Sequence, residues 1–349
     1  MTHKNVEDFY PLSPMQQGML FHSLYAPDSG VYVGQMSATL RGALDTAAFR
    51  RAWARLIERH AVLRTGFVIG ELKEPVQMVH RQVALPFTEL DWRALPAVEQ
   101  AGRLAVFLRD DQRRGFALHQ PPLLRLALIR LADDRYRFIW TYHHLLFDGW
   151  SLPLLLREVF ALYPAFALGR DLALPPVPPF RNYIAWLRKQ NPDEALAFWR
   201  KTLQGFTAPT PLTVDHPAEA PGTVVERMTL LPRAATDALK ALSRQHGLTL
   251  NTFVQGAWAL LLSRYSGESD VVFGATVSGR PADLPGAEHM VGLFINTLPV
   301  RVQLPPDQAA LAWLTALQAS QLEARQYEHS PLVQVQAASE VPRGAPPRR

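Results

Sequence analysis

Cysteine does not occur among the 349 residues of this chain, which excludes disulfides, thiolate zinc sites and a cysteine nucleophile. Long apolar runs are missing as well. The Leu-rich stretch 152–162 is too short to span a membrane and carries Arg157 and Glu158. The N-terminus, MTHKNVEDFYPLSP, lacks the basic and then apolar layout of a secretory signal. These absences predict a cytoplasmic protein that neither spans nor binds a membrane.

Charge of one sign is gathered only in the tail PRGAPPRR and in short pairs such as Arg113-Arg114, although the formal net charge is +5. A nucleic-acid site needs a basic stripe with stacking aromatic residues, and the sequence has none, so we expect no nucleic-acid partner. A mildly basic surface suits an acidic protein partner, or it is simply a solvated surface.

Several catalytic motifs are also missing. The sequence contains no G-x-S-x-G elbow, no H-E-x-x-H pair, no P-loop and no G-x-G-x-x-G loop. These absences argue against a serine acyl-enzyme, a zinc peptidase, a nucleoside triphosphatase and a dinucleotide-binding enzyme.

Helical and strand patterns alternate through both halves of the chain, which predicts two α/β lobes of similar make. Helical spacing occurs over 15–25, 45–60, 97–114, 151–165, 193–203, 233–246, 249–263 and 307–326. Strand patterns occur over 31–40, 63–70, 75–83, 123–131, 135–144, 271–279 and 291–302. Asp45 and Ser151 are suited to cap helices, and Gly247 to end one. The almost wholly apolar body of 249–263 predicts a buried helix.

A proline-rich stretch, LALPPVPPF at 172–180, has few backbone donors and reads as an extended linker. It predicts an N-terminal lobe over 1–171 and a C-terminal lobe over 181–349.

The segment TYHHLLFDGWS (141–151) places two adjacent histidines shortly before an Asp-Gly pair. If the strand period of two persists, His144 follows the aromatic face that ends at Tyr142, and His143 takes the opposite face. We therefore expect one histidine to act in the chemistry and the other to support it structurally. Gly149 permits a positive φ, and the helix N-terminus after it offers amides to a developing negative charge.

This arrangement suits acyl transfer to an amine or a hydroxyl, because a neutral imidazole accepts a proton near pH 7 and nearby amides stabilise an oxyanion. The alternative is that His143 and His144 are core histidines or bind a metal.

The segment HHLLFDGWS closely resembles the HHxxxDG motif of the condensation domains of nonribosomal peptide synthetases. Six further stretches resemble the core motifs of that family in the same order. They are SPMQQGMLFH (13–22), RHAVLRTGF (59–67), FRNYIAWL (180–187), VFGATVSGRP (272–281), MVGLFINTLPVRV (290–302) and YEHSPLVQVQ (327–336). The resemblance covers residues 9 to about 343.

The resemblance implies a V-shaped pseudo-dimer of two chloramphenicol-acetyltransferase-like lobes with a tunnel between them. It implies donor and acceptor thioesters on the phosphopantetheine arms of peptidyl carrier proteins, adenylation domains as further partners, no metal and no bound cofactor, and a monomer. In the family the residue matching His144 orients or deprotonates the attacking amine, and the one matching His143 supports it. The residue matching Asp148 is structural and pairs with the one matching Arg280.

The resemblance also draws attention to further residues in the matching motifs. Arg64 either lines the tunnel or forms an ion pair at a strand end. Trp150 is expected to pack the base of the site, and Asn296 either bonds near the tunnel or caps a bulge. Ser278 and Gly279 belong to a loop that bridges the lobes, where glycine serves backbone geometry.

The opening SPMQQGMLFHSL and the large residue Phe147 before Asp148 resemble the subtype that takes a donor ending in a D-residue. Family domains continue beyond the length seen here, so we expect a C-terminally truncated second lobe with an unpaired sheet edge. Three alternatives stay open on this basis. One is a free-standing acyltransferase that uses coenzyme A, another is an epimerization domain, and the last is an inactive remnant that only binds carrier proteins.

Overall fold

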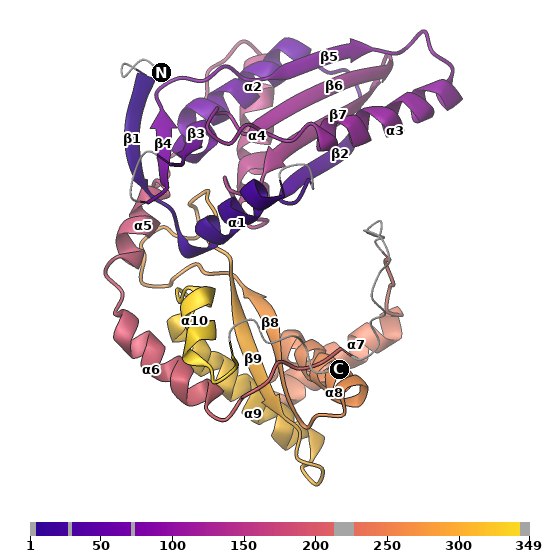
Figure 1. Cartoon of the computed structure of the whole chain (residues 1–349). Helices are drawn as coiled ribbons and strands as arrows, with labels where there is room; N and C mark the ends of the chain where they lie inside the picture. The colour runs from indigo at the N-terminus through magenta and orange to yellow at the C-terminus, as the bar shows by residue number, and fades with distance from the viewer. Residues whose placement is uncertain (1–4, 27–29, 71–73, 213–226, 343–349) are drawn as a thin grey trace. The chain divides into compact units, whose positions relative to one another are not determined.

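The structure, a computed structural model of the chain, describes residues 5–26, 30–70, 74–212 and 227–342. The chain divides into two compact units. The first consists of Met1–Gln190 and Ser278–Ile295, and the second of Asn191–Val277 and Asn296–Arg349. Each unit combines helices with a sheet, as the predicted α/β class requires (Figure 1).

The boundary between the units differs from the predicted linker at 172–180. Leu172 and Leu174 pack against the main core of the first unit, and Phe180 is buried in a second core of that unit. The apolar residues between the prolines therefore hold this stretch on the first unit, and the chain leaves it only after Gln190.

A four-stranded sheet forms the centre of the first unit. Its order is β2 (Val33–Arg41), β7 (Arg135–His143), β6 (Leu124–Ala132) and β5 (Phe87–Asp91). The pairs β2–β7 and β6–β7 are antiparallel, while β5 runs parallel to β6. The strands predicted over 123–131 and 135–144 are confirmed as the antiparallel pair β6 and β7, and β5 is an edge strand that the sequence patterns did not indicate.

Helices cover both faces of this sheet. On one face α2 (Thr46–Arg59) and α4 (Ser151–Ala167) bury Trp53 against Phe138 and Trp140. On the other face α3 (Ala97–Arg113) lies over Ile139 and the neighbouring strand β6 (Figure 1). Asp45 caps α2 as predicted, since its side chain accepts a hydrogen bond from the amide of Ala48 at 2.9 Å.

A smaller sheet of order β1 (Val6–Pro11), β4 (Val76–His80) and β3 (Thr65–Val68) completes the strands of the first unit, and all its pairs are antiparallel. The short turn η3 (Ala61–Arg64) leads into β3, and α5 (Arg181–Leu187) packs near β1. The helix α1 (Pro14–Tyr25) follows β1. A capping box starts it, because Ser13 accepts from the amide of Gln16 while the Gln16 side chain accepts from the amide of Ser13.

In the described part of the second unit, β8 (Asp270–Val277) pairs antiparallel with β9 (Asn296–Gln303) as a two-stranded sheet. The helices of this unit are α6 (Pro192–Leu203), α7 (Arg233–His246), α8 (Leu250–Ser266), α9 (Ala310–Ala324) and α10 (Leu332–Ala338), with the turn η4 (Arg325–Tyr327). Gly247 ends α7 at a φ of 63°, as predicted.

Two predictions for the second half are wrong. The apolar helix α8 is not buried along its body, because Val254, Trp258 and Tyr265 are exposed while only a stripe around Ala259 packs on the core. The strand predicted over 291–302 begins only at Asn296, because the residues before it are bound to the first unit.

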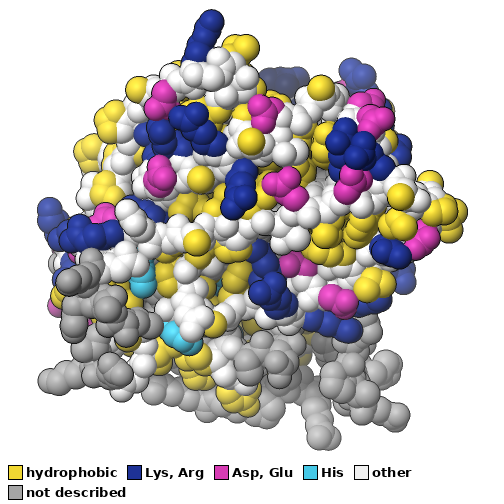
Figure 2. Space-filling model, turned by 90° about the horizontal axis from the view of Figure 1, so that it is seen from above, with side chains coloured by type: hydrophobic (Ala, Val, Ile, Leu, Met, Phe, Trp, Pro, Cys, Tyr) yellow, Lys and Arg dark blue, Asp and Glu magenta, His cyan; other side chains and the backbone are white. Residues whose placement is uncertain are grey.

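On the face shown in Figure 2, Lys and Arg side chains are interspersed with Asp and Glu. None of the helices within the described ranges has both the length and the apolar character that crossing a bilayer requires.

Candidate active site

The histidine pair lies where β7 ends. His143 is the last residue of β7 and stands opposite Val33 of β2, whereas His144 lies just beyond the strand. The predicted alternation holds along β7, because Phe138, Trp140 and Tyr142 all enter the core under α2 and α4.

His143 is a buried support. Its Nδ1 accepts a hydrogen bond from the amide of Leu145 at 3.1 Å, which leaves the ring proton on Nε2, 3.4 Å from the hydroxyl oxygen of Ser23. That hydroxyl donates to the carbonyl of Met19 in turn. Burial, with a contribution from the neighbouring His144, lowers the pKa of His143 to about 4. His143 therefore stays neutral and holds the turn after β7 in place.

His144 is half-buried and fixed through its backbone. Its amide donates to the carbonyl of Tyr32 at 2.8 Å, and its ring lies edge-on to Tyr142 with 5.5 Å between ring centroids. Burial lowers the pKa of His144, and the backbone of Phe147 and the carboxylate of Asp148 oppose this shift without cancelling it. The imidazole is therefore neutral at pH 7, the form that accepts a proton.

Asp148 joins the motif to the returning segment Ser278–Ile295. Its carboxylate is buried and accepts hydrogen bonds from the backbone amides of Phe294 at 2.9 Å and Ile295 at 3.3 Å. Arg280 Nη2 lies 3.5 Å from Oδ1 of the same carboxylate. The Asp148–Arg280 pair, expected from the family resemblance, is thus confirmed as a contact.

Arg280 is itself held from several sides. Its guanidinium donates to the carbonyl of Met290 at 2.9 Å and to that of Ala287, and it stacks over the ring of Phe294 at 4.1 Å. Burial lowers the pKa of Arg280, and the charge of Asp148 opposes the shift. Since both charged groups also form hydrogen bonds with backbone groups, the pair holds the segment Ser278–Ile295 in place.

The residues after Asp148 differ from their predicted roles. Ser151 does not cap α4: it is the first helical residue, fully buried, and its hydroxyl bonds Asp148, the backbone of Gly292 and Arg280. The carboxylate of Asp148 accepts the hydrogen bond from the Ser151 amide instead. Trp150 does not pack the base of the site, because it is 63% exposed, directly before α4.

Gly149 does not adopt the predicted positive φ. It is exposed, and a Cβ at this position would meet no atom within 4 Å. Open space therefore adjoins the first turn of α4, where backbone amides have no intrahelical partners.

Gly279 confirms the prediction that glycine is required by backbone geometry. Its φ is 60°, and a Cβ would lie 1.9 Å from the carbonyl oxygen of Phe294. Ser278, which begins the returning segment, is half-buried. The segment Ser278–Ile295 contacts Asp148 through backbone amides and does not form a β-strand there.

Arg64 and Asn296 have structural contacts. Arg64 forms the ion pair that was one of its two alternatives, at 2.6 Å from Glu7, and is buried. Asn296 belongs to the second unit, where its amide donates to the carbonyls of Glu328 at 2.8 Å and Ser330 at 2.7 Å. It therefore secures the YEHSP segment rather than capping a bulge.

Ser23, Tyr32 and Gly292 were not identified as site residues from the sequence. Tyr32 and Gly292 act through backbone groups, and Ser23 acts through its hydroxyl. A sequence pattern does not indicate such contacts. Tyr32 adopts a φ of 65°, a costly conformation for a bulky residue, next to the His144 amide. Among the described residues no cluster of His, Asp and Glu is suited to hold a metal ion.

Comparison with known proteins agrees with this geometry. The model of the Condensation domain matches residues 6–346. A linear gramicidin synthase chain of Brevibacillus parabrevis is 49% identical over 344 residues, which cover 97% of this chain and 7% of that protein. Tyrocidine synthase 2 of the same organism is 38% identical over 339 residues, covering 97% of this chain and 10% of that protein. The chain thus spans only a small part of these relatives.

Solved structures share the fold. The starter condensation domain of rhizomide synthetase superimposes with a TM-score of 0.78 at 23% identity, over 96% of this chain and 76% of that one. The first condensation domain of the calcium-dependent antibiotic synthetase, in complex with a substrate analogue, has a TM-score of 0.73 at 20% identity, over 93% and 76% of the two chains. This chain belongs to the family of condensation domains of nonribosomal peptide synthetases.

Proposed function

We propose that this chain forms a peptide bond between two acyl groups, each carried as a thioester by a partner protein. The observation that carries the proposal is His144, a neutral imidazole at the end of β7 whose backbone is fixed while the space beside Gly149 stays open. Membership of the condensation family and the synthase relatives support the same chemistry.

In the proposed step, the amine nitrogen of the acceptor attacks the carbonyl carbon of the donor thioester. The carbon–nitrogen bond forms, the carbon–sulfur bond breaks, and the thiolate leaves with the electron pair. His144 takes the proton from the amine and passes it to the departing thiolate, so that the amide and the thiol are both released neutral. The exposed N-terminal end of α4 at Gly149 is the candidate donor to the carbonyl oxygen, which becomes negative on the way.

The other site residues have supporting roles in this proposal. His143 positions the turn that carries His144, and Asp148 with Arg280 fastens the returning segment beneath it. Neither Asp148 nor Arg280 takes part in proton transfer, because Asp148 already accepts hydrogen bonds from backbone amides and Arg280 already donates to backbone carbonyls.

The proposed partners are donor and acceptor peptidyl carrier proteins bearing 4′-phosphopantetheine arms, loaded by adenylation domains. The domain itself would need no resident cofactor, because the thioesters supply the activated carbonyl. A donor ending in a D-residue is favoured by the opening SPMQQGMLFHSL. Phe147 is fully buried against Trp140 and Tyr142, so any effect of Phe147 on the donor would act through packing.

Single-turnover condensation between separately loaded donor and acceptor carrier proteins, followed by mass spectrometry, tests the proposal. His144→Ala should abolish product, whereas His289→Ala, which removes a 60% exposed histidine, should not. The proposal would be contradicted if both variants formed product. It would also be contradicted if the parent chain and both variants formed none. Acyl transfer from coenzyme A thioesters alone would instead indicate a free-standing acyltransferase, and carrier binding without turnover would indicate an inactive remnant.

A further inference from the structure

The side-chain amides of two glutamines form a buried pair beside the turn that carries His144. Gln16, in the first turn of α1, and Gln77, on β4, are both fully buried. Nε2 of Gln77 donates to Oε1 of Gln16 at 3.0 Å, and Nε2 of Gln16 donates to Oε1 of Gln77 at 3.2 Å. The pair therefore joins a helix to a strand whose glutamine lies 61 positions further along the chain.

Neighbouring backbone groups fix which way each side-chain amide points. The backbone amide of Ser13 donates to Oε1 of Gln16 at 2.9 Å, and a backbone N–H requires an oxygen there. Nε2 of Gln16 donates to the carbonyl of Leu145 at 3.0 Å. Nε2 of Gln77 donates to the carbonyl of Pro11 at 2.9 Å. Every N–H of the two side chains thus has an acceptor, and a buried network that is fully satisfied is rigid.

The carbonyl of Leu145 is the point at which this network reaches the turn after β7. The N–H of the same peptide group, on Leu146, donates to the carbonyl of His143 at 3.1 Å. The C=O and N–H of a trans peptide group point in opposite directions. Gln16 therefore holds this peptide group from one side and His143 from the other, which fixes the conformation of the turn.

The imidazole of His144 depends on that turn for its position. Nδ1 of His144 is buried and has no hydrogen-bond partner among the described residues, so the ring is not held through this nitrogen. The ring packs edge-on against Tyr142, and the amide of His144 is held by the carbonyl of Tyr32. The place of the ring is therefore set by the conformation of the backbone from which it projects.

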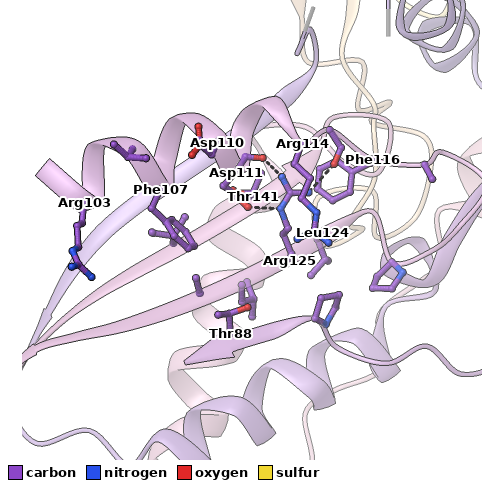
Figure 3. A pocket seen from close by; sticks show the side chains of 18 of the residues that line it. Thr88, Arg103, Phe107, Asp110, Asp111, Arg114, Phe116, Leu124, Arg125 and Thr141 are labelled. Carbon is purple, nitrogen blue, oxygen red and sulfur yellow. Dashed lines mark hydrogen bonds and ion pairs between the residues drawn. The ribbon is translucent and has the colours of Figure 1, made fainter. Parts of the chain in front are cut away.

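A separate network holds the body of β7 from its other face. The carboxylate of Asp111, on α3, accepts hydrogen bonds from the hydroxyl of Thr141 and from the guanidinium of Arg125. Figure 3 shows these three side chains together at one end of the pocket under α3. Thr141 lies within the strand, two residues before His143, so these bonds act on the strand and not on the turn after it.

We propose that Gln77 is a positioning residue for His144 and acts through Gln16 and the carbonyl of Leu145. This inference rests on the proposed function, in which His144 handles the proton of the attacking amine. Gln77 lies outside every stretch that resembles a family motif, so its role follows from its contacts alone. Without Gln77 the side-chain amide of Gln16 loses one donor and one acceptor, and the turn is no longer held in a single conformation.

The test compares two buried glutamines that both donate to backbone carbonyls. Gln77→Met removes the side-chain amide and nearly keeps the side-chain volume. Gln100→Met is the matched control, because Gln100 is also buried and its amide donates to three carbonyls near the start of α3, that of Trp92 at 2.9 Å among them. Chemical denaturation should show a comparable loss of stability in the two variants, because each leaves buried polar groups without a partner.

In turnover between loaded carrier proteins, Gln77→Met should lower kcat about tenfold or more and leave KM nearly unchanged, because a small displacement of a catalytic group slows the chemical step. Gln100→Met should keep the kcat of the parent chain. The double variant of Gln16→Met and Gln77→Met should be no slower than Gln16→Met alone, because residues that act in series do not add. An unchanged kcat in Gln77→Met, or a loss in the double variant equal to the product of the single losses, would overturn the inference.

The NMR signals of the His144 ring give a readout that does not depend on turnover. They are the histidine signals missing from His144→Ala, and the ring current of Tyr142, 5.5 Å away between centroids, makes them sensitive to movement. Gln77→Met should displace these signals and Gln100→Met should not. Signals that stay in place in Gln77→Met would overturn the positioning role. Displaced signals in a parent chain that forms no product would contradict the proposed function and leave the positioning role standing.

A milder variant covers the case in which Gln77→Met does not fold. Gln77→Asn keeps an amide in the site but is one methylene too short to bond Gln16 and Pro11 together. It should lower kcat and displace the His144 signals in the same direction as Gln77→Met. A folded Gln77→Asn with the kcat and the ring signals of the parent chain would overturn the inference.

Discussion

Asp148 Oδ2 accepts a hydrogen bond from the backbone amide of Phe294 at 2.9 Å, although the two residues are 146 positions apart in sequence. This bond, the neighbouring one from Ile295 and the approach of Arg280 bring a distant segment of chain under the histidine motif. A buried carboxylate that gathers this many donors is sensitive to the loss of its charge.

Asp148→Asn should lower the free energy of unfolding by about 3 kcal/mol, because the half-buried Arg280 guanidinium loses its counter-charge and one amide group would face several donors. Chemical denaturation measures the change. Asp91→Asn, which breaks an exposed ion pair with Arg93, should leave stability nearly unchanged. If both variants lose the same small free energy of unfolding, Asp148 does not hold the segment Ser278–Ile295 in place.

Gly279→Ala should destabilise the first unit by about 3 kcal/mol or more, because its Cβ would lie 1.9 Å from the Phe294 carbonyl oxygen and the backbone would have to move. Gly169→Ala is the control. Gly169 has a similar φ of 67°, but a Cβ there meets no atom within 4 Å, so only the cost of the left-handed conformation, about 1 to 2 kcal/mol, should appear. Equal losses in denaturation would refute the steric argument.

The rate of condensation should rise with pH with a midpoint below pH 6.5, the ordinary pKa of histidine, because burial lowers the pKa of His144. The base form is then already dominant at pH 7. The pH profile of kcat/KM, which reports groups of the free enzyme, measures this. A midpoint above pH 7 would mean that another group, or a protonated His144, controls the rate.

Stability should fall between pH 6.5 and about pH 4, because the pKa of His143 drops to about 4 on folding. In that window the unfolded chain binds the proton more readily than the folded chain, so stability is full above pH 6.5 and declines as the pH falls. The share of His143 is roughly 3 kcal/mol. His143→Gln should flatten the decline in denaturation series, with a remainder from His144; an unchanged slope would contradict this.

Local patterns were sufficient for most elements. The stripe of Phe49, Trp53, Leu56 and Ile57 predicted α2, and Asp45 predicted its start. The alternation along 135–144 predicted both β7 and the side of the sheet on which its aromatic residues are buried. These features depend on neighbours in sequence, so the sequence suffices to predict them.

The misses arise where tertiary contacts decide. The residues 291–295 have the composition of a strand. However, backbone amides in this stretch donate to Asp148 and Ser151 and not to a neighbouring strand. Ser151 has the chemistry of a cap, yet burial turns its hydroxyl to Gly292 and Arg280. An apolar helix such as α8 does not reveal from composition which of its faces meets a core.

The return of Ser278–Ile295 to the first unit also sets an order of events during synthesis. Arg280 follows Asp148 by 132 residues, so at about 5 to 20 residues per second the carboxylate leaves the ribosome roughly 7 to 26 s before its partner. The first unit cannot close its core while it is being translated until most of the second has been made. A ribosome stalled before residue 278 would hold a nascent chain whose histidine motif is present but unfastened.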